Sequence, residues 1–150
     1  MWQTILVPVD GSDSSNRALD VAVDLALRYG AELKLLHVME EIGSSRVPPE
    51  LEHYVKMEQV NVSERSFLEA VAKQIVSRAA SRAGEAKVGK VGEEIRVGDP
   101  GHVIVDYAGE TDAGLIVMGR RGFGRIRELF LGSVSHRVSQ LCERDCLTVR

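Results

Sequence analysis

Cysteine is scarce in this chain, and no long apolar run interrupts it. The two cysteines, Cys142 and Cys146, are too few for a disulfide framework or for a zinc site of four ligands. No apolar stretch reaches the roughly 20 residues that a membrane-spanning helix needs, and the first residues do not resemble a signal peptide. These absences argue against disulfide-rich and membrane-spanning classes, and they favour a cytoplasmic protein.

A broad excess of basic residues is also missing. The net charge of −3 excludes a general nucleic-acid binder, which usually carries a positive surface. The 44% of hydrophobic and 27% of charged residues are typical of a soluble globular protein, and 150 residues fit one domain with its own core. The positive charge that is present is local, because Arg120, Arg121, Arg125 and Arg127 lie within eight residues.

Familiar catalytic motifs are absent as well. There is no Gly-Lys-Ser/Thr of a Walker A loop, no His-x-Gly-His, and no histidine with a nucleophile and a carboxylate at recognisable spacing. His37 is predicted to be a core or interface residue of a strand, His53 and His102 to be surface residues, and His136 to lie partly exposed in the first turn of a helix. The sequence therefore predicts no catalytic residue and no protein metal ligand.

Apolar segments alternate with helical patterns along the whole chain. Strands are predicted at 3–9, 32–38, 93–97, 115–118 and 146–149, and helices from Ser12 or Ser14 to about 28 and over about 49–83, 100–108 and 133–143. Because the strands are largely apolar, this order predicts a parallel sheet covered by helices on both faces. Ligands bind such sheets beyond the carboxyl ends of the strands, so Asp10 and Gly119 are expected at one edge.

Glycines dominate the segment after the fourth predicted strand. Gly119 and Gly122 are followed, after nine intervening residues, by Gly132 and Ser133, where a helix begins. Glycine lets backbone N–H groups approach an anion closely, and a helix N-terminus adds unpaired donors. The segment is either a phosphate site, with Arg121 as its best cation, or a surface loop of tight turns with a solvated basic face.

Asp10, Gly11 and Ser12 follow the first predicted strand. These residue types are expected in a turn that caps a helix, which would explain them without any ligand. Asp10 could instead accept a ribose hydroxyl or face a bound cation, because it stands at the end of a strand. Both interpretations stay open.

Together these segments resemble the universal stress protein family in its nucleotide-binding branch. That branch has Gly-x2-Gly-x9-Gly-Ser/Thr, which matches Gly119, Gly122, Gly132 and Ser133, and its opening resembles the segment from Ile5 to Ser12. The resemblance covers nearly the whole chain and is weakest over about 40–65. It implies a single domain over 1–150 with an open five-stranded parallel sheet in the order 3-2-1-4-5, the Rossmann-like, adenine nucleotide alpha hydrolase-type fold.

The resemblance also implies a ligand and a set of contacts. ATP is the expected ligand, with Mg²⁺ or Mn²⁺ on its phosphates. Three groups of residues are implied: Pro8, Val9, Asp10 and Val38 at adenosine, Met118 and Gly119 at the ribose, and Arg121, Gly122, Gly132, Ser133, Val134 and Ser135 at the phosphates. A homodimer through the last strand is implied too, although Asp145-Cys146 stands where the family often has a proline.

Three functions remain for such a protein. The first is a stress-response switch or sensor in which ATP orders the arginine-rich residues 120–131. The second is a slow ATPase or a nucleotidyl-transfer enzyme, for which no general base or activated nucleophile is evident. The third is a dimeric scaffold that does not use nucleotide.

Overall fold

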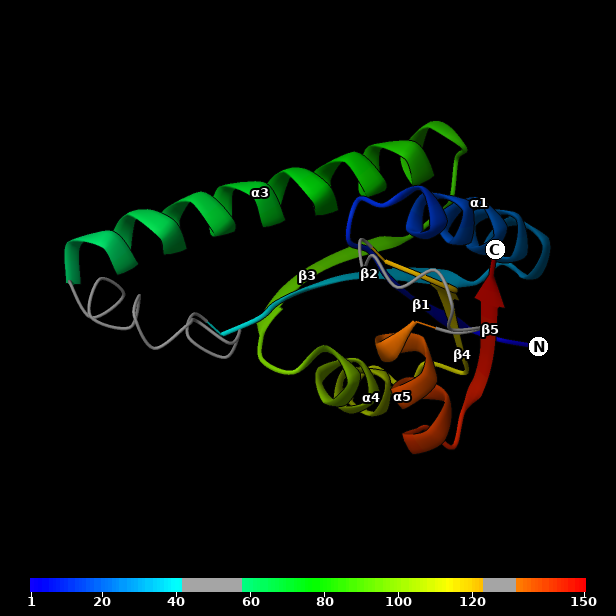
Figure 1. The fold of residues 1–150 in the computed structure, drawn as a ribbon. Coiled ribbons are helices and arrows are strands. Elements are labelled where there is room, and N and C mark those ends of the chain that lie inside the picture. Colours follow the sequence, from blue (N-terminus) through cyan, green and yellow to red (C-terminus); the bar gives the residue numbers. More distant parts are fainter. Residues whose placement is uncertain (42–57, 123–131) are drawn as a thin grey trace.

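The computed structural model describes residues 1–41, 58–122 and 132–150, and of 58–63 the backbone alone. Five parallel strands form one sheet in the order β3-β2-β1-β4-β5, which confirms the predicted class and strand order (Figure 1). The strands are β1 (Thr4–Pro8), β2 (Glu32–Met39), β3 (Val91–Val97), β4 (Leu115–Gly119) and β5 (Asp145–Val149). The helices are α1 (Asp13–Tyr29), α3 (Glu58–Glu85), α4 (Pro100–Glu110) and α5 (Ser133–Leu141).

The long predicted helix over 49–83 is described only from Glu58, since 49–57 lie outside the described residues. The other bounds differ from prediction by one or two residues. Helix α5, for example, ends at Leu141 because Cys142 already has an extended backbone, with φ −92° and ψ 129°. The strands are predicted to be largely apolar, but β3 and β5 are half-buried or exposed because they form the two edges of the sheet.

The sheet separates two cores, and alternation along β1 supplies both. Ile5 and Val7 point to the side covered by α1 and α3, whereas Leu6 points to the side covered by α4 and α5. Figure 1 shows these helix pairs on opposite faces. The period of two in a strand thus converts an apolar run into contacts with both helical layers.

Capping residues determine where α1 begins and ends. Of the two predicted N-caps, Ser12 is the one observed, because its Oγ accepts the Ser15 N–H at 3.2 Å. Gly30 ends the helix in the left-handed conformation with φ 66°. The Ala31 N–H returns to the carbonyl of Ala26 at 3.0 Å, which satisfies a carbonyl of the last turn. The Ser12 cap thus starts α1 directly after the turn that follows β1, and the Gly30 cap ends it just before β2.

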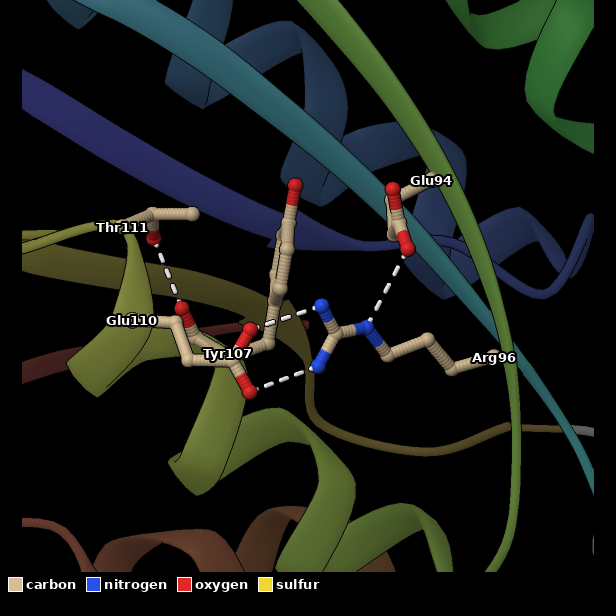
Figure 2. Close-up of polar contacts among 5 residues, drawn as sticks. All are labelled: Glu94, Arg96, Tyr107, Glu110 and Thr111. Atoms are coloured by element: carbon tan, nitrogen blue, oxygen red, sulfur yellow. Dashed lines mark hydrogen bonds and ion pairs between the residues drawn. The ribbon is translucent and has the colours of Figure 1, made fainter.

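Helix α4 is fastened to the edge strand β3 by a group of charged residues (Figure 2). Arg96 binds both carboxylate oxygens of Glu110 at 2.7 and 2.8 Å and Glu94 at 3.2 Å, with its guanidinium 4.5 Å from the Tyr107 ring centroid. The Thr111 hydroxyl donates to the Tyr107 carbonyl at 2.7 Å. The hydrogen bond from Arg96 lowers the pKa of Glu110. This group is internally paired and serves to hold β3 against α4.

Candidate functional site

A pocket of about 470 Å³ opens at the carboxyl edge of the sheet, where strand order reverses between β1 and β4. All the residues that the family resemblance assigned to a nucleotide line it: Pro8, Val9, Asp10, Val38, Met118, Gly119, Arg121, Gly122, Gly132, Ser133, Val134 and Ser135. The expectation that Asp10 and Gly119 share one edge is confirmed. Their roles in binding stay predictions.

Asp10 is oriented by the turn that starts α1. Its Oδ1 accepts the Ser12 N–H at 2.8 Å, and its own N–H donates to the Ser15 hydroxyl at 3.2 Å. Its Oδ2 faces the backbone of Gly122, where an added Cβ would lie 2.6 Å away. The turn interpretation and the ligand interpretation are therefore compatible, because one carboxylate oxygen makes the turn while the other faces a pocket residue.

Close backbone approach explains the glycine motif, by which we mean Gly119, Gly122, Gly132 and Ser133. A Cβ on Gly119 would lie 2.8 Å from the Ser14 carbonyl carbon, and one on Gly132 would lie 3.0 Å from the Arg120 carbonyl oxygen. The Gly132 N–H donates to that same oxygen at 2.7 Å. The two ends of the motif are thus brought together, although the residues between them, 123–131, lie outside the described part of the chain.

Helix α5 directs its N-terminus at the pocket. Its N-cap is Gly132, which has no side chain to accept hydrogen bonds from the first turn. The buried Ser135 hydroxyl donates to the carbonyls of Arg120 and Gly132, at 3.0 and 3.1 Å, so the helix start is held against the end of β4. Ser133 and Val134 also line the pocket, and the N–H groups in the first turn of a helix are of the kind that bind anions.

Positive charge gathers beside this helix start. Arg120 and Arg121 both line the pocket. Burial, and then the charges of Arg150 and Arg121, lower the pKa of the Arg120 guanidinium. An anion placed here would offset the repulsion among these cations. Arg125 and Arg127, the other two members of the predicted basic group, lie outside the described residues.

Apolar residues make up another part of the pocket lining. Leu36, Ile104 and Met118 belong to the core between the sheet and α4, and Val38 packs against that core. Pro100, the first residue of α4, lines the pocket as well. The lining therefore combines apolar surface with arginines and a helix N-terminus.

Eight lining residues are not among the nucleotide contacts that the resemblance implied: Ser12, Ser15, Leu36, His37, Glu40, Pro100, Ile104 and Arg120, of which Arg120 belongs to the predicted basic group. His37 was expected in a core or interface. It is half-buried, and its Nδ1 lies 2.7 Å from the Val9 carbonyl oxygen, so it is hydrogen-bonded but belongs to the pocket wall. Its position one residue before Val38, at the end of a predicted strand, was the signal that could have found it. Pro100 and Ile104 gave no such signal, because their place depends on how α4 packs.

The other histidines and the cysteines of the described residues do not line the pocket. His102 and His136 are exposed, as expected for His102 and more fully than expected for His136, whereas His53 lies outside the described residues. Burial first, then Cys142, raises the pKa of the half-buried Cys146 thiol to about 11, so it stays protonated at neutral pH. Within the described residues no group of three or more His, Cys, Asp or Glu could hold a metal ion, and no helix there is long and apolar enough to cross a membrane.

Comparison with known proteins agrees with this geometry. The model of the universal stress protein family matches residues 1–150. The chain belongs to the universal stress protein family. Universal stress protein YxiE of Bacillus subtilis is 38% identical over an alignment of 159 positions, which covers all of both chains.

Two similar solved structures are complexes of universal stress proteins with nucleotides. A universal stress protein in complex with cAMP has a TM-score of 0.70 and 29% identity, covering 99% of this chain and 97% of its own. The universal stress protein from Archaeoglobus fulgidus in complex with dAMP has a TM-score of 0.67 and 26% identity, covering 99% and 98%. The family and fold of this chain follow from these matches.

Proposed function

We propose that this universal stress protein binds ATP in the carboxyl-edge pocket and acts as a nucleotide-dependent switch or sensor in a stress response of the cytoplasm. The observation that carries the proposal is the pocket itself, whose lining combines the glycine motif, the N-terminus of α5 and two arginines with an apolar surface. The nucleotide complexes of related proteins support the ligand class.

The adenosine of ATP would lie against the apolar part of the pocket lining. Val38 and Ile104 would flank the base, and the Oδ2 of Asp10 would accept a ribose hydroxyl, because Oδ1 is already bonded to the Ser12 N–H. Met118 and Gly119 would border the ribose. This placement leaves the phosphates directed toward the glycine motif.

The phosphates fit the end that is rich in donors. The N–H groups of Ser133, Val134 and Ser135 at the start of α5 would face them, with Arg121, Gly122 and Gly132 beside them. Mg²⁺ or Mn²⁺ would be held mainly by phosphate oxygens, as Mg²⁺ usually is in nucleotide sites, with few ligands from the protein. The switch would consist of ATP ordering residues 120–131 and so altering the surface offered to a partner.

A homodimer through β5 completes the proposal. Strand β5 is paired with β4 on one side and forms an edge of the sheet on the other. Leu147 exposes 38% of its surface on this short strand, so a second copy could extend the sheet and cover apolar area. Asp145, at the place where the family often has proline, accepts a hydrogen bond from the Trp2 indole at 2.9 Å.

The first experiment is mass spectrometry of nucleotide released from freshly purified, denatured protein, followed by ATP titration with magnesium. We expect about one adenine nucleotide per chain, or saturable ATP binding if the protein is isolated empty. A protein that is empty and also binds no added ATP would leave the scaffold as the better function. Many turnovers per site in a hydrolysis assay would instead favour the enzyme.

A glycine variant tests whether the ligand occupies this pocket. In Gly122→Val a Cβ would lie 2.6 Å from the Asp10 carboxylate, and the added methyl groups would enter the pocket. We expect ATP affinity to fall at least tenfold, or about 1.4 kcal/mol. Gly89→Val is the matched control, because nothing lies within 4 Å of a Cβ there and Gly89 is outside the pocket. ATP should also raise hydrogen-exchange protection over residues 120–131.

A further inference from the structure

One buried hydroxyl behind the pocket wall connects three elements. Ser14, in the first turn of α1, exposes 9% of its surface. Its Oγ donates to the carbonyl of Val149 at 3.3 Å and accepts the N–H of Arg121 at 3.4 Å. Helix capping does not require this side chain, because the cap of α1 is made by Ser12. Ser14 does not line the pocket itself.

The contacts of Ser14 converge on the chain as it leaves β4. The Val149 carbonyl, at the end of the edge strand β5, also accepts the Arg120 N–H at 2.7 Å. Two consecutive backbone N–H groups, those of Arg120 and Arg121, are therefore anchored by β5 and by α1. A Cβ on Gly119 would lie 2.6 Å from the Ser14 Oγ, so the first turn of α1 also packs directly on the β4 backbone.

We propose that Ser14 is a positioning residue for the phosphate end of the pocket. A hydroxyl suits this place because it can donate to the Val149 carbonyl and accept from the Arg121 N–H at once. By holding Arg121 against β5, Ser14 sets where the backbone of Arg121 and Gly122 lies relative to the start of α5. This inference rests on the proposed nucleotide function, and it adds a residue that acts through Arg121 and not by touching ligand.

The test compares ATP with adenosine in Ser14→Ala. Losing one or two neutral hydrogen bonds should weaken ATP binding roughly 3- to 10-fold, while adenosine affinity stays within about twofold, because adenosine has no phosphate to place. Amide exchange of Arg121 in the ligand-free protein should accelerate by a similar factor. Thr111→Val is the control, since it removes a hydroxyl bonded to a backbone carbonyl at the far end of α4.

The outcomes separate the two proposals. If Ser14→Ala weakens ATP and adenosine equally, or neither, while wild type binds ATP, the positioning role of Ser14 is wrong and the nucleotide site stands. If wild type binds neither ligand, the proposed function fails. The amide exchange rate of Arg121 tests the anchoring by Ser14 without any ligand. If Ser14→Ala leaves that rate unchanged, Ser14 does not anchor the Arg121 backbone and the positioning role is wrong, whether or not the protein binds nucleotide.

Discussion

Close contacts, and not unusual backbone angles, account for the glycines of the motif. Among the described residues the glycines with positive φ are Gly11, Gly30 and Gly98. Gly119 has an ordinary φ, yet a Cβ there would meet α1 at under 3 Å. The same distance argument applies to Gly122 and Asp10. Glycine is therefore needed in the motif because neighbouring backbone atoms and the Asp10 carboxylate lie too close for a side chain.

Gly119→Ala should destabilise the fold. The new Cβ would lie 2.8 Å from the Ser14 carbonyl carbon and 2.9 Å from the Ser15 nitrogen, which are backbone atoms that cannot turn away. We expect the free energy of unfolding to fall by about 1–3 kcal/mol, as in other overpacked sites. Urea unfolding monitored by Trp2 fluorescence and by circular dichroism measures this change.

Gly109→Ala is the matched control for that variant. Gly109 lies inside α4, and a Cβ there would have no neighbour within 4 Å. Alanine should therefore raise stability by about 0.5–1 kcal/mol through its better helix propensity. Equal effects of the two substitutions would mean that the contact between Gly119 and α1 is not tight in solution.

Helices α4 and α5 both reach the pocket with their N-termini, and one carboxylate joins them. Asp99 caps α4 by accepting the His102 N–H at 3.1 Å, and its other oxygen accepts a hydrogen bond from Arg137 of α5 at 2.9 Å. Gly101 permits this contact, since a Cβ there would lie 2.5 Å from the Arg137 Cδ. Asp99 thus keeps the start of α4, with Pro100, in place against α5.

Asp99→Ala should lower the free energy of unfolding at pH 7 by about 1 kcal/mol, the usual effect of losing an N-cap. Hydrogen bonds from His102, and then the charge of Arg137, lower the pKa of Asp99 below its ordinary 3.8. Since the folded pKa is the lower one, the stabilisation is complete above pH 3.8 and is lost as the pH falls through the folded value. Thermal melts from pH 7 to pH 2 should show the two proteins converge at acid pH.

The control is Asp106→Ala, which removes the same charge from an exposed position of the same helix. It should change stability by under about 0.5 kcal/mol, as is common for surface substitutions. A deficit in Asp99→Ala that stays constant down to pH 2 would show that the carboxylate charge contributes nothing.

The whole molecule presents two sheet edges of different character. Strand β3 is fastened to α4 through Arg96 and carries several charges, whereas β5 is short and exposes Leu147. Charged side chains on an edge oppose pairing with another sheet, and an apolar edge permits it. The distribution of charge therefore favours assembly through β5 and disfavours it through β3.

Leu147→Lys should convert the proposed homodimer to a monomer. The substitution puts a charge at the centre of the proposed interface, where a second copy would repeat it. Sedimentation velocity over a range of concentrations measures the result. Val97→Lys is the matched control, because Val97 is 46% exposed on the opposite edge and should leave the dimer intact. A dimer that survives Leu147→Lys and dissociates in Val97→Lys would place the interface at β3.

Local pattern was enough to predict much of this protein. Apolar runs and caps placed the strands and helices, because burial and capping depend on residues near in sequence. Resemblance to the family supplied the strand order and the twelve pocket residues. Periodicity alone did not supply the order, since it does not distinguish which strands are neighbours.

Packing across the sheet decided the rest. Ile104 in the pocket lining and the Ser14 bridge to Val149 depend on contacts between residues far apart in the chain. Such contacts depend on how the helices pack on the twisted sheet, and the spacing of residues in the sequence does not predict them. The sequence by itself determined the elements and the residues of the glycine motif, and the tertiary structure determined which surfaces those residues meet.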